Sequence, residues 1–307
     1  MKRFYIAILL FLLPVFIFMG GTEYVVRHIP NEYKYKNDWM EQHVEEVETL
    51  ILGNSHTQVG LNPVFMGDHT FNLSIAGQDY LYTHFLFFKY VKKLKHLKTL
   101  IIPVSYFSFY KDLHGDNSVT MQELYYRIYM GSPYHRYDIT YNMESLYYKP
   151  LLGKLRNLYN SNYRWCPKGW SPWLKSDKSP IWNSCHVNKA LARLNFAHSY
   201  IHVSENYRQL ADIADYCNHH GIKFVLVSTP QTKEYNGCLN EKQIENTQKT
   251  IKKLQRQYVV EYYDFREDYR YKDDDFFDQS HLSEIGAEKF TKNLMSCIQR
   301  SSYCDLE

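Results

Sequence analysis

Two short stretches near opposite ends of the chain carry residue types that can do chemistry together. The tetrapeptide GNSH at 53–56 follows an apolar run and presents Ser55, while Asp278 stands three positions before His281. A serine hydroxyl is a poor nucleophile unless a base lies within hydrogen-bond reach and a third group orients that base. In a loop, the spacing of Asp278 and His281 lets the carboxylate fold back onto one imidazole nitrogen, and the other nitrogen can then take a proton from serine. The sequence therefore predicts acyl-group chemistry by a serine nucleophile.

Each of the two motifs is weak when taken alone. A Gly-x-Ser sequence is most often only a turn, and a pair spaced like Asp278 and His281 is often a cap or a surface pair. The combination is stronger because the motifs stand in the right order on suitable elements. Ser55 follows the first expected strand, and His281 precedes the last expected helix, for which Ser283 is the expected N-cap.

Short β-rich runs alternate with helical stretches along most of the chain. The third and fourth runs are almost continuously apolar, as strands covered on both faces are. This alternation predicts a parallel sheet of about five strands with helices on both faces, a three-layer flavodoxin-like α/β fold. The expected strands are 49–53, 69–74, 98–105, 223–230 and 259–265, and the expected helices are 79–97, 204–220, 241–258 and 283–299.

One long segment, residues 109–200, does not follow the alternation and is rich in Tyr, Asn, Pro and Trp. Structureless loops longer than about 15 residues are uncommon, so we expect an insertion that forms irregular helices and a lid. Insertions at the carboxyl ends of parallel strands lie where ligands bind. Four tryptophans of the segment are either platforms for sugar rings or its own small core: Trp165, Trp170, Trp173 and Trp182.

The N-terminus combines two positive charges, Lys2 and Arg3, with an apolar run at 4–19. This order predicts a single membrane span with the N-terminus on the cytoplasmic side and the body outside. A secretory signal looks similar, but no clear small-x-small cleavage site follows, which favours an uncleaved anchor. The expected domains are an anchor in the cytoplasmic membrane at 1–22 and an extracytoplasmic α/β domain at 23–307 that contains the insertion.

Composition and motif content exclude several classes of function. A formal net charge of +3 over 307 residues provides no strong field for nucleic acid, and no nucleic-acid motif is present. The chain has no Walker loop, GxGxxG or HExxH, and the adjacent His219 and His220 point about 100° apart on a helix. We therefore expect no metal and no cofactor. The six cysteines include no CxxC pair, and an exported body permits disulfides whose connectivity the spacing does not decide.

These residues resemble the SGNH (GDSL-like) hydrolase superfamily. The resemblance rests on the GNSH turn at 53–56 after a first strand, on Gly77 after a second strand, and on Asp278 and His281 before the last helix. It covers the core strands and both ends of the chain but not the aromatic insertion. The nearest similarity is to the membrane-anchored branch of the superfamily, the alginate-acetylation and teichoic-acid D-alanylation type proteins, which handle acyl groups on envelope polymers.

The resemblance implies a role for each matching residue. Ser55 is similar to the nucleophile, His281 to the base and Asp278 to the group that orients the base. The backbone N–H groups of Ser55 and Gly77 are similar to two oxyanion-hole donors. Donors aimed at a developing oxyanion are typically worth about 3 kcal/mol each.

One position departs from the superfamily's pattern. The third oxyanion donor of the superfamily is an Asn after strand three, and none stands there in this chain, where Ser105 is the nearest polar residue. This departure weakens the expectation of rapid hydrolysis but not that of acyl transfer. His56 and Ser105 are candidate substrate-binding residues, and for His56 the alternative is a histidine that only caps or packs at the helix start.

From the resemblance and the N-terminal segment we expect a membrane-tethered serine esterase or O-acyltransferase. Its expected partners are an exported cell-envelope polysaccharide or glycoconjugate, which is the substrate, and a membrane acyltransferase. A second hypothesis is a non-catalytic glycan-binding or assembly component of an envelope acylation system, which the missing Asn favours. A third is a small-molecule lipase or esterase, which a short apolar lid would favour.

Overall fold

The computed structural model describes residues 2–113, 120–134, 142–146, 152, 154, 167–171, 174–176 and 202–304. The chain divides into two compact units. The first unit joins Met1–Asp38 to His114–Arg164, and the second joins Trp39–Leu113 to Trp165–Glu307. The boundary between the N-terminal parts falls within helix α2 (Glu32–His43). All of the residues with expected roles in chemistry belong to the second unit.

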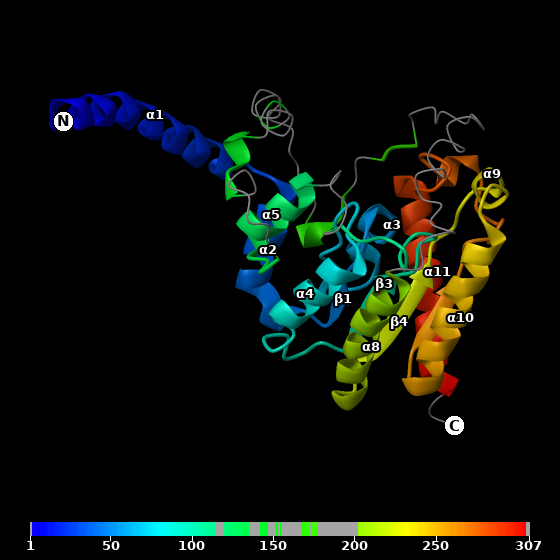
Figure 1. Ribbon diagram of the computed structural model, residues 1–307. Helices are drawn as coiled ribbons and strands as arrows, with labels where there is room; N and C mark the ends of the chain where they lie inside the picture. The colour runs from blue at the N-terminus through cyan, green and yellow to red at the C-terminus, as the bar shows by residue number, and fades with distance from the viewer. Residues whose placement is uncertain are drawn as a thin grey trace. The chain divides into compact units, whose positions relative to one another are not determined.

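The second unit is built on a five-stranded parallel sheet in the order β2-β1-β3-β4-β5 (Figure 1). This confirms the expected flavodoxin-like α/β architecture, in which ligands bind outside the carboxyl ends of the strands where the strand order reverses. That reversal lies at β1 and β3. The strands are shorter than expected: β1 (Thr49–Ile51), β2 (Thr70–Asn72), β3 (Thr99–Pro103), β4 (Lys223–Ser228) and β5 (Glu261–Asp264).

Helices cover the sheet of this unit. Helices α4 and α8 pack against each other, and α8 packs on β4 and α10. Helices α3 and α11 pack against each other as a second group. The helices are α3 (Ser55–Gly60), α4 (Tyr80–Tyr90), α8 (Val203–His219), the short α9 (Lys233–Asn236), α10 (Glu241–Gln257) and α11 (Glu284–Cys304), with 3-10 turns η1 (Val44–Glu46), η2 (Pro63–Phe65), η6 (Pro167–Gly169) and η7 (Asp273–Asp275).

Helix α4 ends at Tyr90, seven residues before the expected end of the 79–97 helix. The chain continues in tight turns, in which the Lys93 N–H donates to the Tyr90 carbonyl and the Leu94 N–H to the Val91 carbonyl. Val91, Leu94 and Leu97 are buried at three-residue spacing. That spacing fits turns closed between residues three apart better than it fits an α-helix.

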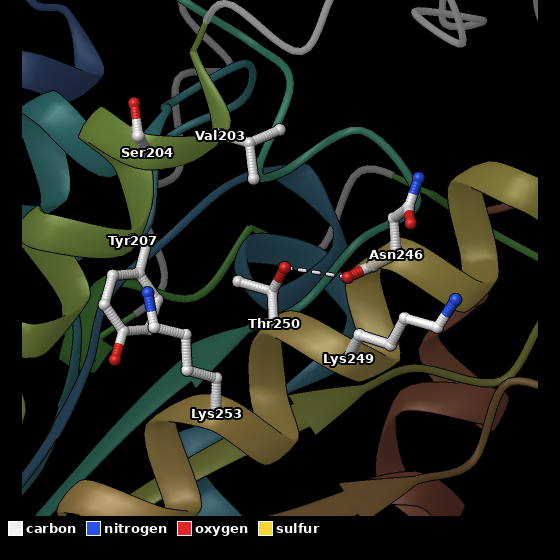
Figure 2. A pocket seen from close by; sticks show the side chains of 7 residues that line it. All are labelled: Val203, Ser204, Tyr207, Asn246, Lys249, Thr250 and Lys253. Carbon is white, nitrogen blue, oxygen red and sulfur yellow. Dashed lines mark hydrogen bonds between the residues drawn. The ribbon is translucent and has the colours of Figure 1, made fainter.

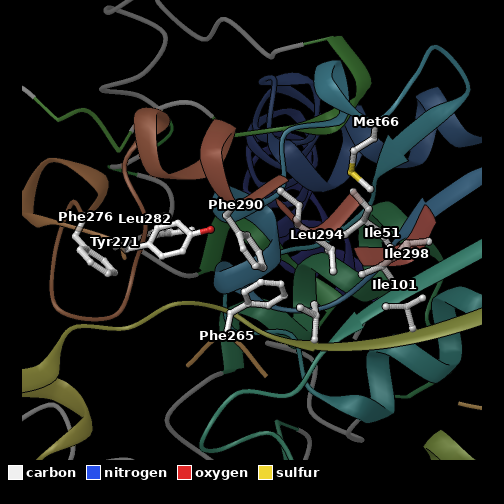
Figure 3. Packing of buried hydrophobic residues seen from close by; sticks show 13 residues of the cluster. Ile51, Met66, Ile101, Phe265, Tyr271, Phe276, Leu282, Phe290, Leu294 and Ile298 are labelled. Atoms are coloured by element: carbon white, nitrogen blue, oxygen red, sulfur yellow. The ribbon is translucent and has the colours of Figure 1, made fainter. Parts of the chain in front are cut away.

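The core under α11 joins the sheet to the last helix (Figure 3). Side chains of β1, β3 and β4 contribute Ile51, Ile101 and Val225 to it, and Phe290 and Leu294 of α11 pack against them. All five are fully buried. This packing fixes the start of α11, and therefore the loop that precedes it, relative to the central strands.

The first unit contains α1 (Lys2–His28), α5 (Thr120–Met130) and the turn η5 (Glu144–Leu146). In the described part of the chain, α1 is the one helix long and apolar enough to cross a membrane, a test that a signal sequence also passes. Helix α5 is a regular helix inside the segment that was expected to be irregular. Its buried face includes Tyr126 and Met130, so tyrosines supply part of the apolar stripe.

Candidate active site

The turn between β1 and α3 presents Ser55 at the carboxyl end of a central strand. Gly53 has a φ of 128°, and a Cβ at this position would lie 2.2 Å from Cδ of Pro103. Only glycine satisfies both conditions without strain. The Asn54 carboxamide oxygen accepts from the His56 N–H at 3.0 Å and so caps the first turn of α3. The Gly-Asn pair therefore makes a sharp strand-to-helix turn with Ser55 as the first helical residue.

The Asp278–His281 loop folds back on itself, as the spacing predicted. The Asp278 carboxylate accepts from the backbone N–H groups of Ser280 at 2.8 Å and His281 at 2.9 Å. The same carboxylate lies 2.9 Å and 3.0 Å from Nδ1 of His281. The Phe277 N–H donates to the His281 carbonyl at 2.9 Å and closes the loop. The carboxylate thus orients both the backbone and the ring of the histidine.

The first turn of α11 holds this loop in place. The Ser283 hydroxyl accepts from the Gly286 N–H at 3.2 Å, which confirms Ser283 as the N-cap, and it donates to the Asp274 carbonyl at 2.6 Å. A Cβ at Gly286 would lie 1.9 Å from the Asp275 carbonyl oxygen. The helix can approach the loop this closely only because residue 286 has no side chain.

The fold brings the two motifs into contact although Ser55 and His281 are 226 positions apart. Nε2 of His281 lies 2.9 Å from Oγ of Ser55. When Nδ1–H donates to Asp278, Nε2 has a free lone pair and the Ser55 hydroxyl donates to it. Burial alone would raise the pKa of Asp278, but its hydrogen bond to His281 and the charge of that ring lower it to about 2. The arrangement can move a proton from a hydroxyl to an imidazole beside a fixed negative charge.

A buried polar layer supports the nucleophile turn. The Asn54 amide donates to the Ser105 hydroxyl at 3.0 Å, and that hydroxyl lies 3.2 Å from Nδ1 of His56. The Thr229 hydroxyl lies 3.3 Å from the same nitrogen. Burial, followed by the charge of His281, lowers the pKa of His56 to about 3. His56 is therefore neutral and packs in this layer.

The two candidate substrate-binding side chains, His56 and Ser105, lie within this layer. His56 is 4% exposed and Ser105 is 3% exposed, and they are hydrogen-bond partners of each other. Their observed contacts are those of residues that support the nucleophile turn. Direct substrate contact by either one stays a prediction.

The two expected oxyanion donors lie in the turns that follow β1 and β2. Gly77 lies in the turn after β2, is partly exposed, and has a φ of 76°. Its carbonyl accepts from Nζ of Lys111 at 2.7 Å. In the described part of the chain, neither the Ser55 amide nor the Gly77 amide has a hydrogen-bond partner. Their use as an oxyanion hole stays a prediction.

A cavity of about 750 Å³ lies elsewhere, between α8 and α10 (Figure 2). Several of its polar groups already have partners inside the chain. Nζ of Lys253 lies 4.2 Å from the centre of the Tyr207 ring, and the Thr250 hydroxyl donates to the Asn246 carbonyl at 2.7 Å. None of the residues of the Ser–His–Asp arrangement lines it. Its full lining is Val203, Ser204, Tyr207, Asn246, Lys249, Thr250 and Lys253.

Of the four tryptophans predicted as platforms or core of the insertion, one is described. Trp170 is described, and its indole N–H donates to the Val59 carbonyl at 2.8 Å. This contact gives Trp170 a structural partner on the helix that carries Ser55, which no sequence motif indicated. The other three tryptophans and two of the cysteines lie outside the described residues: Trp165, Trp173, Trp182, Cys166 and Cys185.

The described residues include free thiols but no cluster of metal ligands. Cys217, Cys238 and Cys297 are free thiols. Within the described ranges, no group of three or more His, Cys, Asp and Glu side chains could hold a metal ion.

Comparisons with known proteins add little to this geometry. No family model matches the chain, and no curated protein matches its sequence. A solved structure from Streptococcus pneumonia, provisionally described as a platelet activating factor, is 10% identical over 94% of this chain and 97% of that chain, with a TM-score of 0.40. A likeness this distant carries no statement about family or chemistry. We therefore infer function from the site itself.

Proposed function

We propose that the protein is a serine-dependent esterase or O-acyltransferase. The single observation that supports this proposal is the continuous hydrogen-bonded arrangement from the Ser55 hydroxyl through the His281 imidazole to the Asp278 carboxylate. Three groups in this order form the general device for activating a serine. A half-buried carboxylate that stays charged stabilises the imidazolium that forms when the histidine takes a proton.

In the proposed reaction, Ser55 Oγ attacks the carbonyl carbon of an acyl ester, and its proton passes to Nε2 of His281. The new negative charge on the carbonyl oxygen is stabilised by the amides of Ser55 and Gly77, which have no other partner in the described structure. Collapse of this intermediate breaks the ester bond, and the leaving alcohol takes the proton from His281. An acyl–Ser55 ester remains, and water or a sugar hydroxyl then takes the acyl group by the same steps in reverse.

The substrate class follows from the resemblance to the SGNH superfamily and from α1. We propose that an acetyl-type acyl group is moved on an exported cell-envelope polysaccharide or glycoconjugate, with a membrane acyltransferase as partner. The apolar side chains of α1 are highly exposed, for example Phe11 and Phe18, each 74% exposed. Such a helix fits a membrane, and the positive residues at its start, Lys2 and Arg3, favour an extracytoplasmic body.

The experiment that tests the chemistry is covalent labelling of the full chain in detergent with a fluorophosphonate, read by intact mass. We expect one adduct per chain, because a hydroxyl hydrogen-bonded to an imidazole base reacts far faster than an ordinary serine. Ser55→Ala and His281→Ala should abolish the adduct. Ser204→Ala is the matched control, since Ser204 is an exposed serine of the same unit and should leave labelling unchanged.

The result also decides between the hypotheses. No adduct on a protein that is folded by circular dichroism would contradict the enzymatic proposal and favour the glycan-binding or assembly role. An adduct that survives Ser55→Ala would place the reactive serine elsewhere. Given an adduct, release of the acyl group from an acetyl ester to an added oligosaccharide, rather than to water, would identify the transferase.

A further inference from the structure

Two described segments of the aromatic insertion, 167–171 and 174–176, attach to the two elements that carry the Ser–His pair. We name these two segments together the bracket. The first contacts α3, which begins with Ser55, and the second contacts the start of α11, which follows the His281 loop. All of these elements belong to the second unit. The contacts at each end are specific hydrogen bonds.

At the α3 end, the bracket supplies donors to the helix C-terminus. The Trp170 indole N–H donates to the Val59 carbonyl at 2.8 Å, and the Ser171 N–H donates to the Gln58 carbonyl at 3.4 Å. The last carbonyls of a helix have no partner within that helix. Because α3 has only six residues, these two bonds hold a large part of the element that presents Ser55.

At the α11 end, the bracket binds Glu284 through both its backbone and its side chain. The Glu284 N–H donates to the Leu174 carbonyl at 3.1 Å. The Glu284 carboxylate accepts from the Ser176 N–H at 2.8 Å and from its hydroxyl at 3.0 Å. Glu284 is three positions after His281, so these bonds hold the base loop at its junction with the helix.

The bracket also packs against β2 at Gly169, where there is no room for a side chain. Gly169 has a φ of 78°, and a Cβ there would lie 2.2 Å from the Asn72 carbonyl oxygen of β2. Beside it, Nζ of Lys168 donates to the Gly67 carbonyl at 3.1 Å and lies 3.2 Å from the Asp68 carboxylate. The first segment is therefore also fixed next to β2, on the N-terminal side of its contact with α3.

We propose that the bracket holds α3 and the start of α11 in register, so that Ser55 Oγ stays within reach of His281 Nε2. Trp170 and Glu284 are positioning residues. Trp170 contacts α3 and Glu284 contacts the bracket, and neither residue contacts a reacting atom. The effect on the reactivity of Ser55 rests on the proposed function. The effect on the positions of α3 and α11 does not. Small displacements of reacting groups slow a reaction strongly, so loss of either attachment lowers the reactivity of Ser55.

The test uses the full chain in detergent and two measurements. The first is the rate constant of fluorophosphonate labelling, and the second is amide hydrogen exchange in peptides that cover 55–61 and 278–287. Trp170→Phe keeps an aromatic ring but removes the N–H donor. Its matched control is Trp39→Phe, a half-buried tryptophan of the same unit that stacks on Phe71 at 3.8 Å.

Trp170→Phe and Glu284→Ala should each label at least about tenfold more slowly than the wild type. Both variants should exchange amide hydrogens faster in both peptides. Trp170→Phe should therefore also affect the peptide 278–287, and Glu284→Ala the peptide 55–61. Glu284→Gln should restore most of the rate, because its side-chain oxygen still accepts from Ser176. Trp39→Phe should change neither measurement.

Wild-type labelling rates in Trp170→Phe and Glu284→Ala would overturn the proposal, as would an exchange change confined to the substituted side. If the wild type itself is not labelled, the proposed function fails and the exchange measurement alone decides the bracket. Faster exchange in both peptides would then support the mechanical role, and unchanged exchange would overturn it.

Discussion

Asp278 has two tasks in the arrangement, since it orients the histidine ring and also accepts two backbone N–H groups of its own loop. Asp278→Asn keeps the shape and an oxygen for those amides, but its NH₂ group can donate to Nδ1. The proton of His281 then moves to Nε2, which can no longer accept from Ser55. We expect labelling to slow by about 10³-fold or more with little loss of thermal stability.

The matched control for this prediction is Asp215→Asn, an exposed carboxylate on α8. It should label at the wild-type rate. A rate for Asp278→Asn within a few fold of wild type would mean that the carboxylate does not set the tautomer of the base.

His56 makes the stability of the fold depend on pH. Its pKa is about 3 in the folded chain, because the ring is buried beside His281, and about 6.5 when unfolded. Between these values the unfolded state binds more protons, so stability is complete above about pH 6.5 and falls as pH drops toward 3. The slope from this residue is up to about 1.4 kcal/mol per pH unit.

Urea unfolding at several pH values between about 4 and 7 measures this slope. The unfolding free energy of His56→Gln should depend on pH less steeply than that of the wild type, by up to about 1.4 kcal/mol per pH unit. Asp79, whose pKa burial raises to about 6, acts in the opposite direction, so the comparison is between the slopes of the two proteins. Equal slopes would contradict a neutral, buried His56.

At the scale of elements, the strand-to-helix turn of β1 and α3 depends on Asn54. Its side chain caps α3 and donates to Ser105, so Asn54→Ala removes both bonds. We expect a loss of about 1–2 kcal/mol of unfolding free energy. We also expect slower labelling, because the first turn of α3 carries the nucleophile.

Asn240→Ala is the control for this prediction, because Asn240 caps α10 by the same bond to a backbone N–H, at 3.2 Å. It should cost similar stability but leave labelling unchanged. If both variants label equally fast, the cap of α3 is a stability feature only.

The sequence allowed prediction of these elements because each has a local cause. The buried apolar runs marked the strands, and the spacing of Asp278 and His281 marked a loop that folds back on itself. Strand ends were predicted too long because residues after each strand, such as Gly53, stay buried while leaving the sheet. The alternation with helices indicated that the strands are parallel.

Two elements could not be predicted in the same way. The bracket binds α3 through the carbonyls of Gln58 and Val59, and backbone acceptors leave no side-chain pattern in a sequence. Helix α5 was missed because its buried face includes Tyr125, Tyr126 and Tyr129, residues with a polar tip. The contact between Ser55 and His281 could be predicted only from their residue types, because the two residues are 226 positions apart and no local pattern joins them.

At the scale of the whole molecule, α1 belongs partly to a folded unit. The Glu23 carboxylate is nearly buried and accepts from the backbone N–H groups of Glu144 at 3.0 Å and Ser145 at 2.8 Å. Nε of Arg27 donates to it at 2.6 Å, and Val26 is buried. The apolar part of the helix before Glu23 is exposed, whereas Glu23 and Val26 are buried in the first unit.

This continuity predicts that α1 is retained rather than removed. Cleavage near Thr22 would make Glu23 a helix terminus, where the first turn frays and the carboxylate loses its fixed position. Protein extracted from membranes should therefore still contain residues 2–22, which peptide mass mapping would detect. Glu23→Ala should lower the unfolding free energy of the first unit by about 1–3 kcal/mol. Asp38→Ala, which removes an exposed paired carboxylate of the same unit, should change it little. A mature chain that starts near Glu23 and stays equally stable would mean that α1 acts only as a signal for export.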